Sequence, residues 1–177
     1  MKQHADFWQV TEDALGYALE IFNLQDRSLQ KQLMEAYLHL DCYEEVPKAL
    51  EDLKRRGLRT AILSNGSPTM LEAAVKNSGL AGLLDQTLSV EEVGVYKPDP
   101  RVYRLAVNRL GLEAGEIAFQ STNAWDVAGA KAFGFRVVWI NRFGQARERL
   151  PFGPDVEIAS MVELEGCLFP HGDGTEK

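Results

Sequence analysis

The stretch from 119 to 126, Phe-Gln-Ser-Thr-Asn-Ala-Trp-Asp, concentrates the side chains of this sequence that are best suited to chemistry. Ser121, Thr122, Asn123 and Asp126 stand where an apolar run ends and a segment rich in small residues, 127–133, begins. Open α/β sheets place their ligands at such carboxyl ends of strands. A carboxylate there could orient or deprotonate a water molecule. The simpler alternative is that Asn123 or Asp126 caps a helix, which leaves the other polar residues without a role.

Two more polar clusters follow predicted strand ends. Ser64-Asn65-Gly66-Ser67 comes after the apolar segment 58–63, and the start of a helix there suits a carboxylate or phosphate. Taken alone, this cluster is explained slightly better as a turn with a helix cap. Lys97 lies beside Pro98 in a segment whose prolines restrict the backbone. The sequence leaves open whether Lys97 is a fixed charge clamp or a solvated surface group.

Strands that alternate with helices predict a parallel α/β sheet with right-handed crossovers. The first forty residues form an all-helical piece, and the polar tail, 171–177, is expected to be disordered. Helices are expected at residues 6–22, 28–40, 46–56, 69–77, 102–110, 127–133 and 161–168, and strands at 58–63, 86–90, 116–120, 136–140 and 156–158.

Charge and composition exclude several classes of protein. The net charge of −7 argues against binding to nucleic acid. No apolar stretch approaches the length of a membrane span, and no signal peptide is recognisable at the N-terminus. Cys42 and Cys167 lie far apart, without metal-ligand spacing, and are expected to be unpaired thiols in a reducing cytoplasm. The length suits one domain, or one domain with a small appendage.

Three motifs carry a resemblance to a known family. Leu63-Ser64-Asn65-Gly66-Ser67-Pro68, Tyr96-Lys97-Pro98-Asp99-Pro100-Arg101-Val102-Tyr103 and Ser121-Thr122-Asn123-Ala124-Trp125-Asp126 resemble the second, third and fourth motifs of the haloacid dehalogenase superfamily. More narrowly, they resemble those of the (S)-2-haloacid dehalogenases, and residues 6–11 resemble that family's helical cap. The resemblance implies a partial helical cap, residues 1–43, and a Rossmann-like core, residues 44–170.

The Asn-Ala-Trp-Asp form of the last motif distinguishes dehalogenases from the phosphatases of the superfamily. Phosphatases usually carry two acidic residues there, which hold Mg²⁺, and Asn123 stands in place of one of them. A haloacid has no phosphoryl group whose charge a metal must balance. The resemblance therefore implies a reaction without a metal or other cofactor.

The resemblance also assigns roles in the hydrolysis of short (S)-2-haloalkanoic acids to (R)-2-hydroxyalkanoic acids through an aspartyl ester. Lys97 would pair with the nucleophile, and Asp126 would position the hydrolytic water and act as its base. The other roles are implied as follows: Ser64 and Asn65 bind the substrate carboxylate, Tyr103, Ser121 and Asn123 complete the polar shell, and Trp125 and Phe7 line the apolar pocket. For Tyr103 and Phe7, ordinary core packing is an equally good explanation.

One departure from the family pattern is large. The family begins with a strand that ends in Asp-x-Tyr-Gly-Thr and supplies the nucleophilic aspartate, and no such motif occurs in this sequence. Part of the cap is also missing, including an arginine that helps to bind substrate. The sequence thus resembles a dehalogenase without its N-terminal portion, and we expect the chain alone to have little or no activity.

Two alternatives stay open at this point: a phosphatase-like hydrolase of the same superfamily, and a non-catalytic fragment that keeps the fold. The resemblance also implies a small-molecule substrate and a homodimer.

Overall fold

The computed structural model describes residues 4–24 and 26–169, so the predicted disordered tail at 171–177 lies outside the described residues. The chain divides into two compact units, one made of residues 1–43 and 60–96, the other of residues 44–59 and 97–177. Within the described residues, β1 and β2 form a sheet in the first unit, and β3, β4 and β5 form a sheet in the second. All strand pairs are parallel, which confirms the predicted α/β class. The predicted division into a cap and a core stays a prediction.

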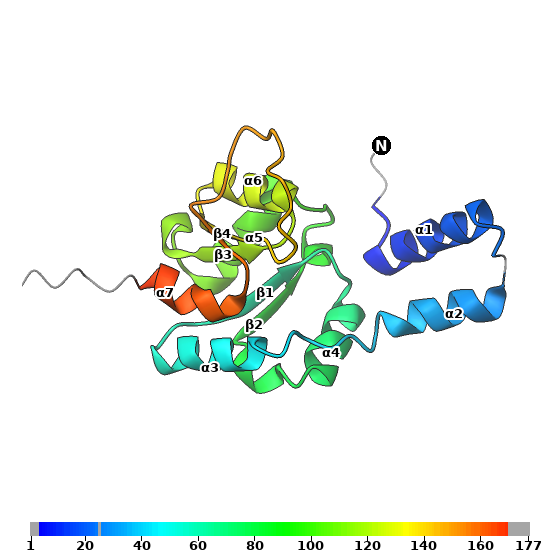
Figure 1. Cartoon of the computed structure of the whole chain (residues 1–177), viewed down its shortest axis with the longest axis horizontal. Helices are drawn as coiled ribbons and strands as arrows, with labels where there is room; N and C mark the ends of the chain where they lie inside the picture. The colour runs from blue at the N-terminus through cyan, green and yellow to red at the C-terminus, as the bar shows by residue number, and fades with distance from the viewer. Residues whose placement is uncertain (1–3, 25, 170–177) are drawn as a thin grey trace, which may run out of the picture. The chain divides into compact units, whose positions relative to one another are not determined.

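The first unit begins with a pair of helices, α1 (Phe7–Ile21) and α2 (Arg27–Ala36), that pack on each other (Figure 1). Each follows an aspartate whose carboxylate accepts backbone N–H groups of the first turn: Asp6 accepts from Gln9 at 2.9 Å and Asp26 accepts from Ser28 at 2.7 Å. The second helix ends four residues earlier than predicted. The chain tightens there into turns, since the N–H groups of Leu38 and His39 donate to carbonyls three residues back.

The sheet of the first unit joins β1 (Ala61–Ser64) to β2 (Gln86–Ser89) through α4 (Pro68–Asn77). Ser64 is in register with Ser89, so the two carboxyl ends are level. Two short 3₁₀ turns, η1 (Ala81–Leu83) and η2 (Val90–Glu92), flank β2. The predicted strand 58–63 begins only at Ala61, because Thr60 uses its N–H to bind the Asp85 carboxylate at 2.8 Å.

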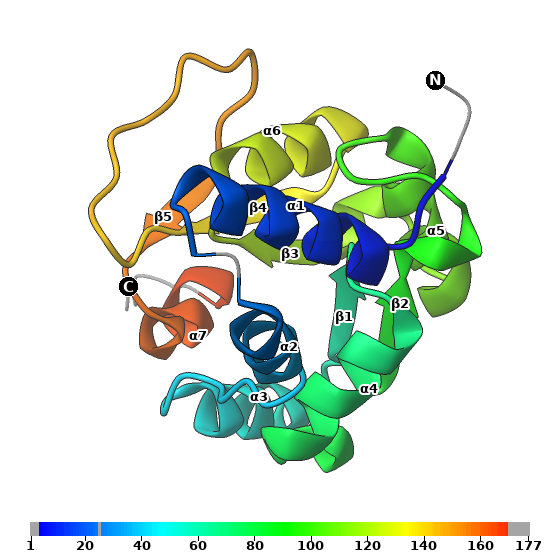
Figure 2. The ribbon, with the colours of Figure 1, turned by 90° about the vertical axis from the view of Figure 1, so that its right-hand side faces the viewer.

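The second unit contains the three-stranded sheet, in the order β3 (Ala118–Ser121), β4 (Arg136–Ile140) and β5 (Val156–Ile158) (Figure 2). The helical elements of this unit are α3 (Val46–Arg55), α5 (Pro100–Leu110), η3 (Ala114–Glu116), α6 (Ala124–Phe133), η4 (Met161–Glu163) and α7 (Leu164–Leu168). The helix expected over 161–168 is therefore a 3₁₀ turn followed by a short α-helix.

Two clusters of buried and partly buried side chains hold the second unit together. Leu53, Val138, Ile140, Ile158 and Leu164 form an aliphatic core between α3, the sheet and α7. An aromatic cluster of Tyr103, Phe119, Phe133 and Phe135 has ring centroids 5.1–5.9 Å apart. Such aromatic contacts stabilise a core beyond the area they bury. The aromatic cluster fixes the position of Tyr103, one of the predicted site residues.

Gly129 in α6 permits a close approach of this helix to Tyr103 and Pro98. A Cβ atom at this position would lie 2.6 Å from the Tyr103 hydroxyl oxygen and 2.6 Å from Cβ of Pro98. We expect Gly129→Ala to lower the free energy of unfolding by about 1–3 kcal/mol, because the overlap outweighs the better helix propensity of alanine. Urea unfolding measures this change.

Gly115→Ala is the matched control, since a Cβ at Gly115 meets nothing within 4 Å. Its effect should stay within about 0.5 kcal/mol. Equal stability of the two variants would contradict the close approach of α6 to Tyr103.

No helix in residues 4–24 and 26–169 combines the length and the apolar character that crossing a membrane requires.

Candidate active site

The helix that follows β3 begins earlier than the sequence predicted. It was expected at 127, but α6 begins at Ala124, because the N–H groups of Asp126 and Val127 both donate to the Asn123 carbonyl at 3.0 Å. Trp125 and Asp126 therefore lie in the first helical turn. A carboxylate in that turn interacts favourably with the helix dipole. Asn123 is the N-cap residue by position, but its side chain makes no capping hydrogen bond.

The Asp126 carboxylate lies at the centre of the candidate site. Its Oδ2 is 3.0 Å from Lys97 Nζ, and its Oδ1 accepts a hydrogen bond from the Tyr103 hydroxyl at 2.8 Å. The side chains of Lys97 and Asp126 are only 8% and 5% exposed. An ion pair so deeply buried requires good geometry and additional hydrogen bonds, and Tyr103 supplies one of them. The fold thus brings together three predicted site residues, Lys97, Tyr103 and Asp126.

Burial also sets the protonation of the two partners of Asp126. It lowers the pKa of Lys97 below the ordinary 10.5, and the charge of Asp126 offsets this effect only in part. For Tyr103, burial and then the Asp126 charge raise the pKa far above its usual value, so the phenol stays protonated. The Lys97 ammonium also lies 4.7 Å from the centroid of the Phe119 ring, a cation–π contact. Lys97 is therefore a buried and paired side chain rather than a solvated surface group, and its role as a charge clamp stays a prediction.

Two prolines, Pro98 and Pro100, follow Lys97 and shape the segment that leads into α5. The Lys97–Pro98 peptide bond is cis. The helix α5 starts at Pro100, two residues before its predicted start, because Asp99 caps it by accepting the N–H of Arg101 at 2.9 Å and proline suits the first helical position. The side chain and then the backbone N–H of Arg101 hold the pKa of Asp99 down to about 2.

Of the remaining predicted residues of this region, Asn123 and Trp125 lie in the wall of a cavity, and Ser121 supports the turn before them. Ser121 accepts the N–H of Asn123 with its hydroxyl at 3.2 Å, which shapes the turn between β3 and α6. Asn123 and Trp125 line a cavity of about 270 Å³ together with residues 141–148, from the segment that follows β4. The indole of Trp139 ties the two segments by donating to the Thr122 carbonyl at 3.1 Å.

Comparison with known proteins identifies the family. A model of the haloacid dehalogenase-like hydrolases matches residues 2–134. (S)-2-haloacid dehalogenase 4A of Burkholderia cepacia is 49% identical to the chain over 166 residues, which cover 93% of this chain and 71% of that protein. The (S)-2-haloacid dehalogenase of Pseudomonas sp. (strain YL) is 48% identical over 93% of this chain and 72% of its own length. The chain belongs to the haloacid dehalogenase-like hydrolases.

Solved structures of the family superpose on most of the chain. A dehalogenase in an intermediate complex is 45% identical and matches with a TM-score of 0.90, over 93% of this chain and 74% of that one. The L-2-haloacid dehalogenase of Xanthobacter autotrophicus, with chloropropionic acid covalently bound, is 33% identical and has a TM-score of 0.88, over 95% of this chain and 78% of its own. The predicted fold and family are thereby confirmed.

Three predicted site residues of this dehalogenase-like chain belong to the first unit. The Ser64 hydroxyl accepts the N–H of Gly66 at 3.0 Å, so the carboxyl end of β1 forms the predicted turn, with Asn65 at its centre. The Phe7 ring lies 6.0 Å from that of Tyr96, with the planes inclined by 60°. The ring thus packs on an aromatic neighbour, which agrees with ordinary packing, and the substrate roles of all three stay predictions.

The segment 141–148 was missed as part of the site, although the sequence carried a signal for it. It follows the carboxyl end of β4, the same kind of position that drew attention to Ser64 and Ser121. Asn141, Arg142 and Gln145 are polar residues directly after that strand. The last of the three motifs ends at Asp126, so none of them reaches this segment.

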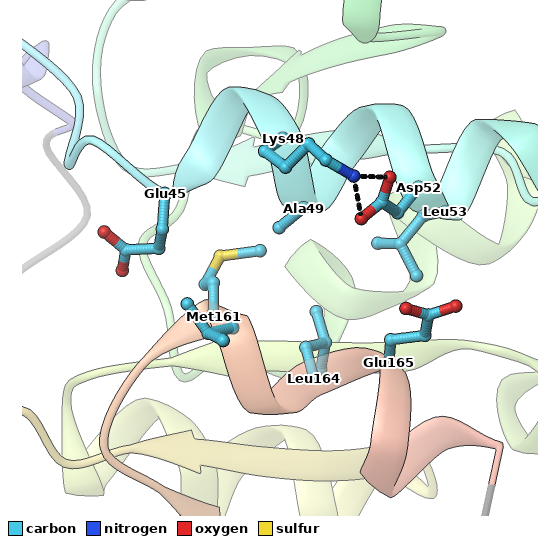
Figure 3. Close-up of a pocket in the computed structure, with 9 residues that line it drawn as sticks. Glu45, Lys48, Ala49, Asp52, Leu53, Met161, Leu164 and Glu165 are labelled. Atoms are coloured by element: carbon cyan, nitrogen blue, oxygen red, sulfur yellow. Dashed lines mark hydrogen bonds and ion pairs between the residues drawn. The ribbon is translucent and has the colours of Figure 1, made fainter.

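Figure 3 shows a smaller cavity of the second unit, about 110 Å³, between α3 and the η4–α7 segment. Its charged residues are engaged with one another or with neighbours: Lys48 with Asp52 at 2.6 Å, and Glu165 with Arg56. None of the predicted site residues lines it. Its lining residues are Glu45, Lys48, Ala49, Asp52, Leu53, Met161, Val162, Leu164 and Glu165. Nothing in this arrangement suits the expected reaction.

In the described part of the chain, no group of three or more histidine, cysteine, aspartate or glutamate side chains is placed to hold a metal ion.

Proposed function

We propose that this chain carries the site for hydrolytic dehalogenation of short (S)-2-haloalkanoic acids to (R)-2-hydroxyalkanoic acids. The observation that supports this most directly is the buried Asp126 carboxylate, paired with Lys97 and bonded to Tyr103. The names of the relatives point to the same reaction. A structural neighbour with chloropropionic acid covalently bound supports a route through a covalent intermediate.

The proposed reaction has two steps. A carboxylate oxygen attacks C2 of the haloacid, a C–O bond forms, and the C–halogen bond breaks with inversion and release of halide. Water then attacks the ester carbonyl, the alcohol leaves with a proton, and the carboxylate is regenerated. Asp126 is the proposed base for that water. A carboxylate has about four acceptor positions, so it can bind a water in addition to Lys97 and Tyr103.

The remaining residues are proposed to hold the substrate. Ser64 and Asn65 bind its carboxylate, and Ser121 and Asn123 complete the polar shell. Trp125 and Phe7 line the apolar part, and Lys97 stabilises the negative charge that both steps require. No metal or other cofactor is needed in this scheme, because halide leaves without a phosphoryl group to be neutralised.

We propose that the attacking carboxylate is not supplied by the residues described here. Among residues 4–24 and 26–169, Asp126 is the only aspartate or glutamate that is buried, and it is already assigned to the water. The chain alone is then expected to bind a haloacid without turning it over. A homodimer and a cytoplasmic location are proposed from the resemblance alone.

Chloride release from (S)-2-chloropropionate by the 177-residue chain, measured beside binding of the same acid by calorimetry, tests both parts of this proposal. We expect binding of the (S) acid in preference to the (R) acid, and chloride release at the level of buffer. Sustained release of chloride would support the proposed reaction and would overturn the proposal that the described residues lack the nucleophile. Mg²⁺-dependent release of phosphate from p-nitrophenyl phosphate would favour a phosphatase, and binding of neither class of compound would favour a non-catalytic fragment.

A further inference from the structure

Trp139, near the carboxyl end of β4, contacts the turn that carries several predicted site residues. Its side chain is buried, with 2% exposed, and it is in register with Ser121 of β3. The indole N–H reaches one residue beyond Ser121 and donates to the Thr122 carbonyl at 3.1 Å. A buried indole N–H needs a hydrogen-bond partner, and this one finds its partner in the turn between β3 and α6.

The peptide group between Thr122 and Asn123 is held at both ends. Trp139 binds its carbonyl, and the Ser121 hydroxyl accepts its N–H, which belongs to Asn123, at 3.2 Å. A peptide group is planar, so contacts to both of its polar atoms fix its rotation. That rotation sets the backbone of Asn123, and with it the direction of the Asn123 side chain.

The side chain of Asn123 does not cap the helix that begins there. An asparagine at the N-cap ordinarily accepts an N–H of the first turn with its side-chain oxygen. Asn123 is the N-cap residue of α6 and has extended backbone, with φ −92° and ψ 118°, but its side chain makes no such bond. Instead, Asn123 lines the cavity between this turn and the segment 141–148. An amide that is free of the cap is available to a ligand.

We propose that Trp139 is a positioning residue of the site. By binding the Thr122 carbonyl, it keeps the Asn123 side chain off the cap of α6 and leaves it available to hydrogen-bond the substrate. Without the indole N–H, the peptide group is released at one end, and the Asn123 side chain takes the capping position that asparagine favours. The role toward a substrate rests on the proposed function, whereas the position of Asn123 relative to the cap does not.

Asn123→Ala tests the uncapped state of α6 directly. In the original chain it should leave the urea midpoint of unfolding unchanged, because no side-chain capping bond is lost. Asp99→Ala is the control, since the Asp99 carboxylate caps α5 by accepting the N–H of Arg101 at 2.9 Å, and its removal should lower the midpoint. This comparison requires no change at Trp139, so it decides the state of Asn123 even if variants of Trp139 fail to fold.

Trp139→Phe removes the indole N–H and keeps an aromatic ring in the core. We expect the binding of (S)-2-chloropropionate, measured by calorimetry on the full chain, to weaken about threefold to tenfold, the usual effect of one lost hydrogen bond. Adding Asn123→Ala should weaken binding no further, because the Asn123 side chain has already left the ligand. The same addition should now lower the urea midpoint, because it removes a cap that the original chain does not have.

The neighbouring residue Val138 provides the matched control for a loss of stability alone. It is 1% exposed and belongs to the aliphatic core with residues of α3 and α7. Adjacent residues of a strand point to opposite faces, so Val138 lies on the other side of β4 from Trp139. Val138→Ala leaves a cavity and lowers stability, but it should change neither the binding of the acid nor the effect of Asn123→Ala on the midpoint.

The measured outcomes separate this inference from the proposed function. A urea midpoint that Asn123→Ala lowers in the Trp139→Phe chain and not in the original chain, together with weakened binding by Trp139→Phe, supports the inference. Equal effects of Asn123→Ala in the two chains, or unchanged binding by Trp139→Phe, overturn it and leave the proposed function standing. If the original chain does not bind the acid, the proposed function is overturned and the role of Trp139 toward a substrate with it. The urea comparison then still decides whether Trp139 keeps Asn123 off the cap.

Discussion

Asp126→Ala is expected to lower the free energy of unfolding by about 3–5 kcal/mol, the usual cost of removing one partner from a buried ion pair. The cost is high because the variant leaves Lys97, whose side chain is 8% exposed, without the carboxylate 3.0 Å from its ammonium group. The Tyr103 hydroxyl loses its 2.8 Å acceptor as well, although it keeps a longer contact of 3.3 Å to the Asp126 carbonyl. Urea unfolding followed by circular dichroism measures the difference.

An exposed ion pair provides the comparison. Lys48, 64% exposed, pairs with Asp52 within α3, and Lys48→Ala should cost at most about 1 kcal/mol. The double variant Lys97→Met with Asp126→Leu removes both buried charges, and we expect it to recover most of the stability that Asp126→Ala loses. If Asp126→Ala costs no more than Lys48→Ala, the buried pair does not stabilise the fold as argued.

The stability of Asp126→Ala relative to the unchanged chain should depend on pH. The pKa of Lys97 in the folded chain lies below 10.5, its ordinary value in the unfolded chain. At a pH between the folded-state pKa and 10.5, the unfolded chain holds a proton that the folded chain has released. The free energy of unfolding therefore rises with pH in this interval. Without Asp126, burial acts unopposed and the pKa falls further. The stability deficit of Asp126→Ala should therefore narrow as the pH rises through the interval between the two folded-state pKa values. A deficit that is constant over that interval would indicate that Lys97 keeps its pKa.

The types of the elements could be predicted from the sequence, because apolar periodicity and the glycines after several helices mark them. The positions of the helix starts could not. Asp99 and Pro100 begin α5, and Asn123 begins α6, because caps and first-turn carbonyls extend each helix toward the strand before it. These shifts matter for the site, since they bring Trp125 and Asp126 into a helical turn. Local capping geometry is decided by hydrogen bonds that a pattern of apolar residues does not specify.

The candidate site was predicted in its members but only partly in its contacts. Lys97, Tyr103 and Asp126 were all selected from motifs, and the structure adds an ion pair of Lys97 with Asp126 that the motifs did not predict. The pairing of Lys97 with a nucleophile stays a prediction. The sequence separation of 29 residues between Lys97 and Asp126 gives no sign of this contact, which depends on how α5 packs on α6 and α6 on the sheet. The neighbours of Gly129, which are Tyr103 and Pro98, and the place of the segment 141–148 beside Trp125 were not predicted either, because close approach and cavity shape are properties of packing.

A fusion that places the family's first strand, ending in Asp-x-Tyr-Gly-Thr, with the cap residues that follow it ahead of Met1 is expected to raise chloride release from (S)-2-chloropropionate by on the order of 10⁴- to 10⁶-fold. Effects of that size accompany the loss of a covalent nucleophile from an enzyme. The physical reason is that Lys97 and Asp126 can stabilise charge and activate water, but neither can form the ester in the proposed scheme. Chloride release and the mass of the intact protein are measured together.

The decisive comparison uses two variants of that fusion. With the added aspartate replaced by asparagine, chloride release should return to the level of the original chain, which excludes a purely structural effect of the added segment. With Asp126→Asn instead, the first step survives and the second is slowed, so that about one chloride is released per chain while the protein gains the mass of the acid residue. Steady turnover by the Asp126→Asn fusion would exclude Asp126 as the base. Loss of both the ester and the chloride would assign Asp126 to ester formation, through its pairing with Lys97, rather than to the water.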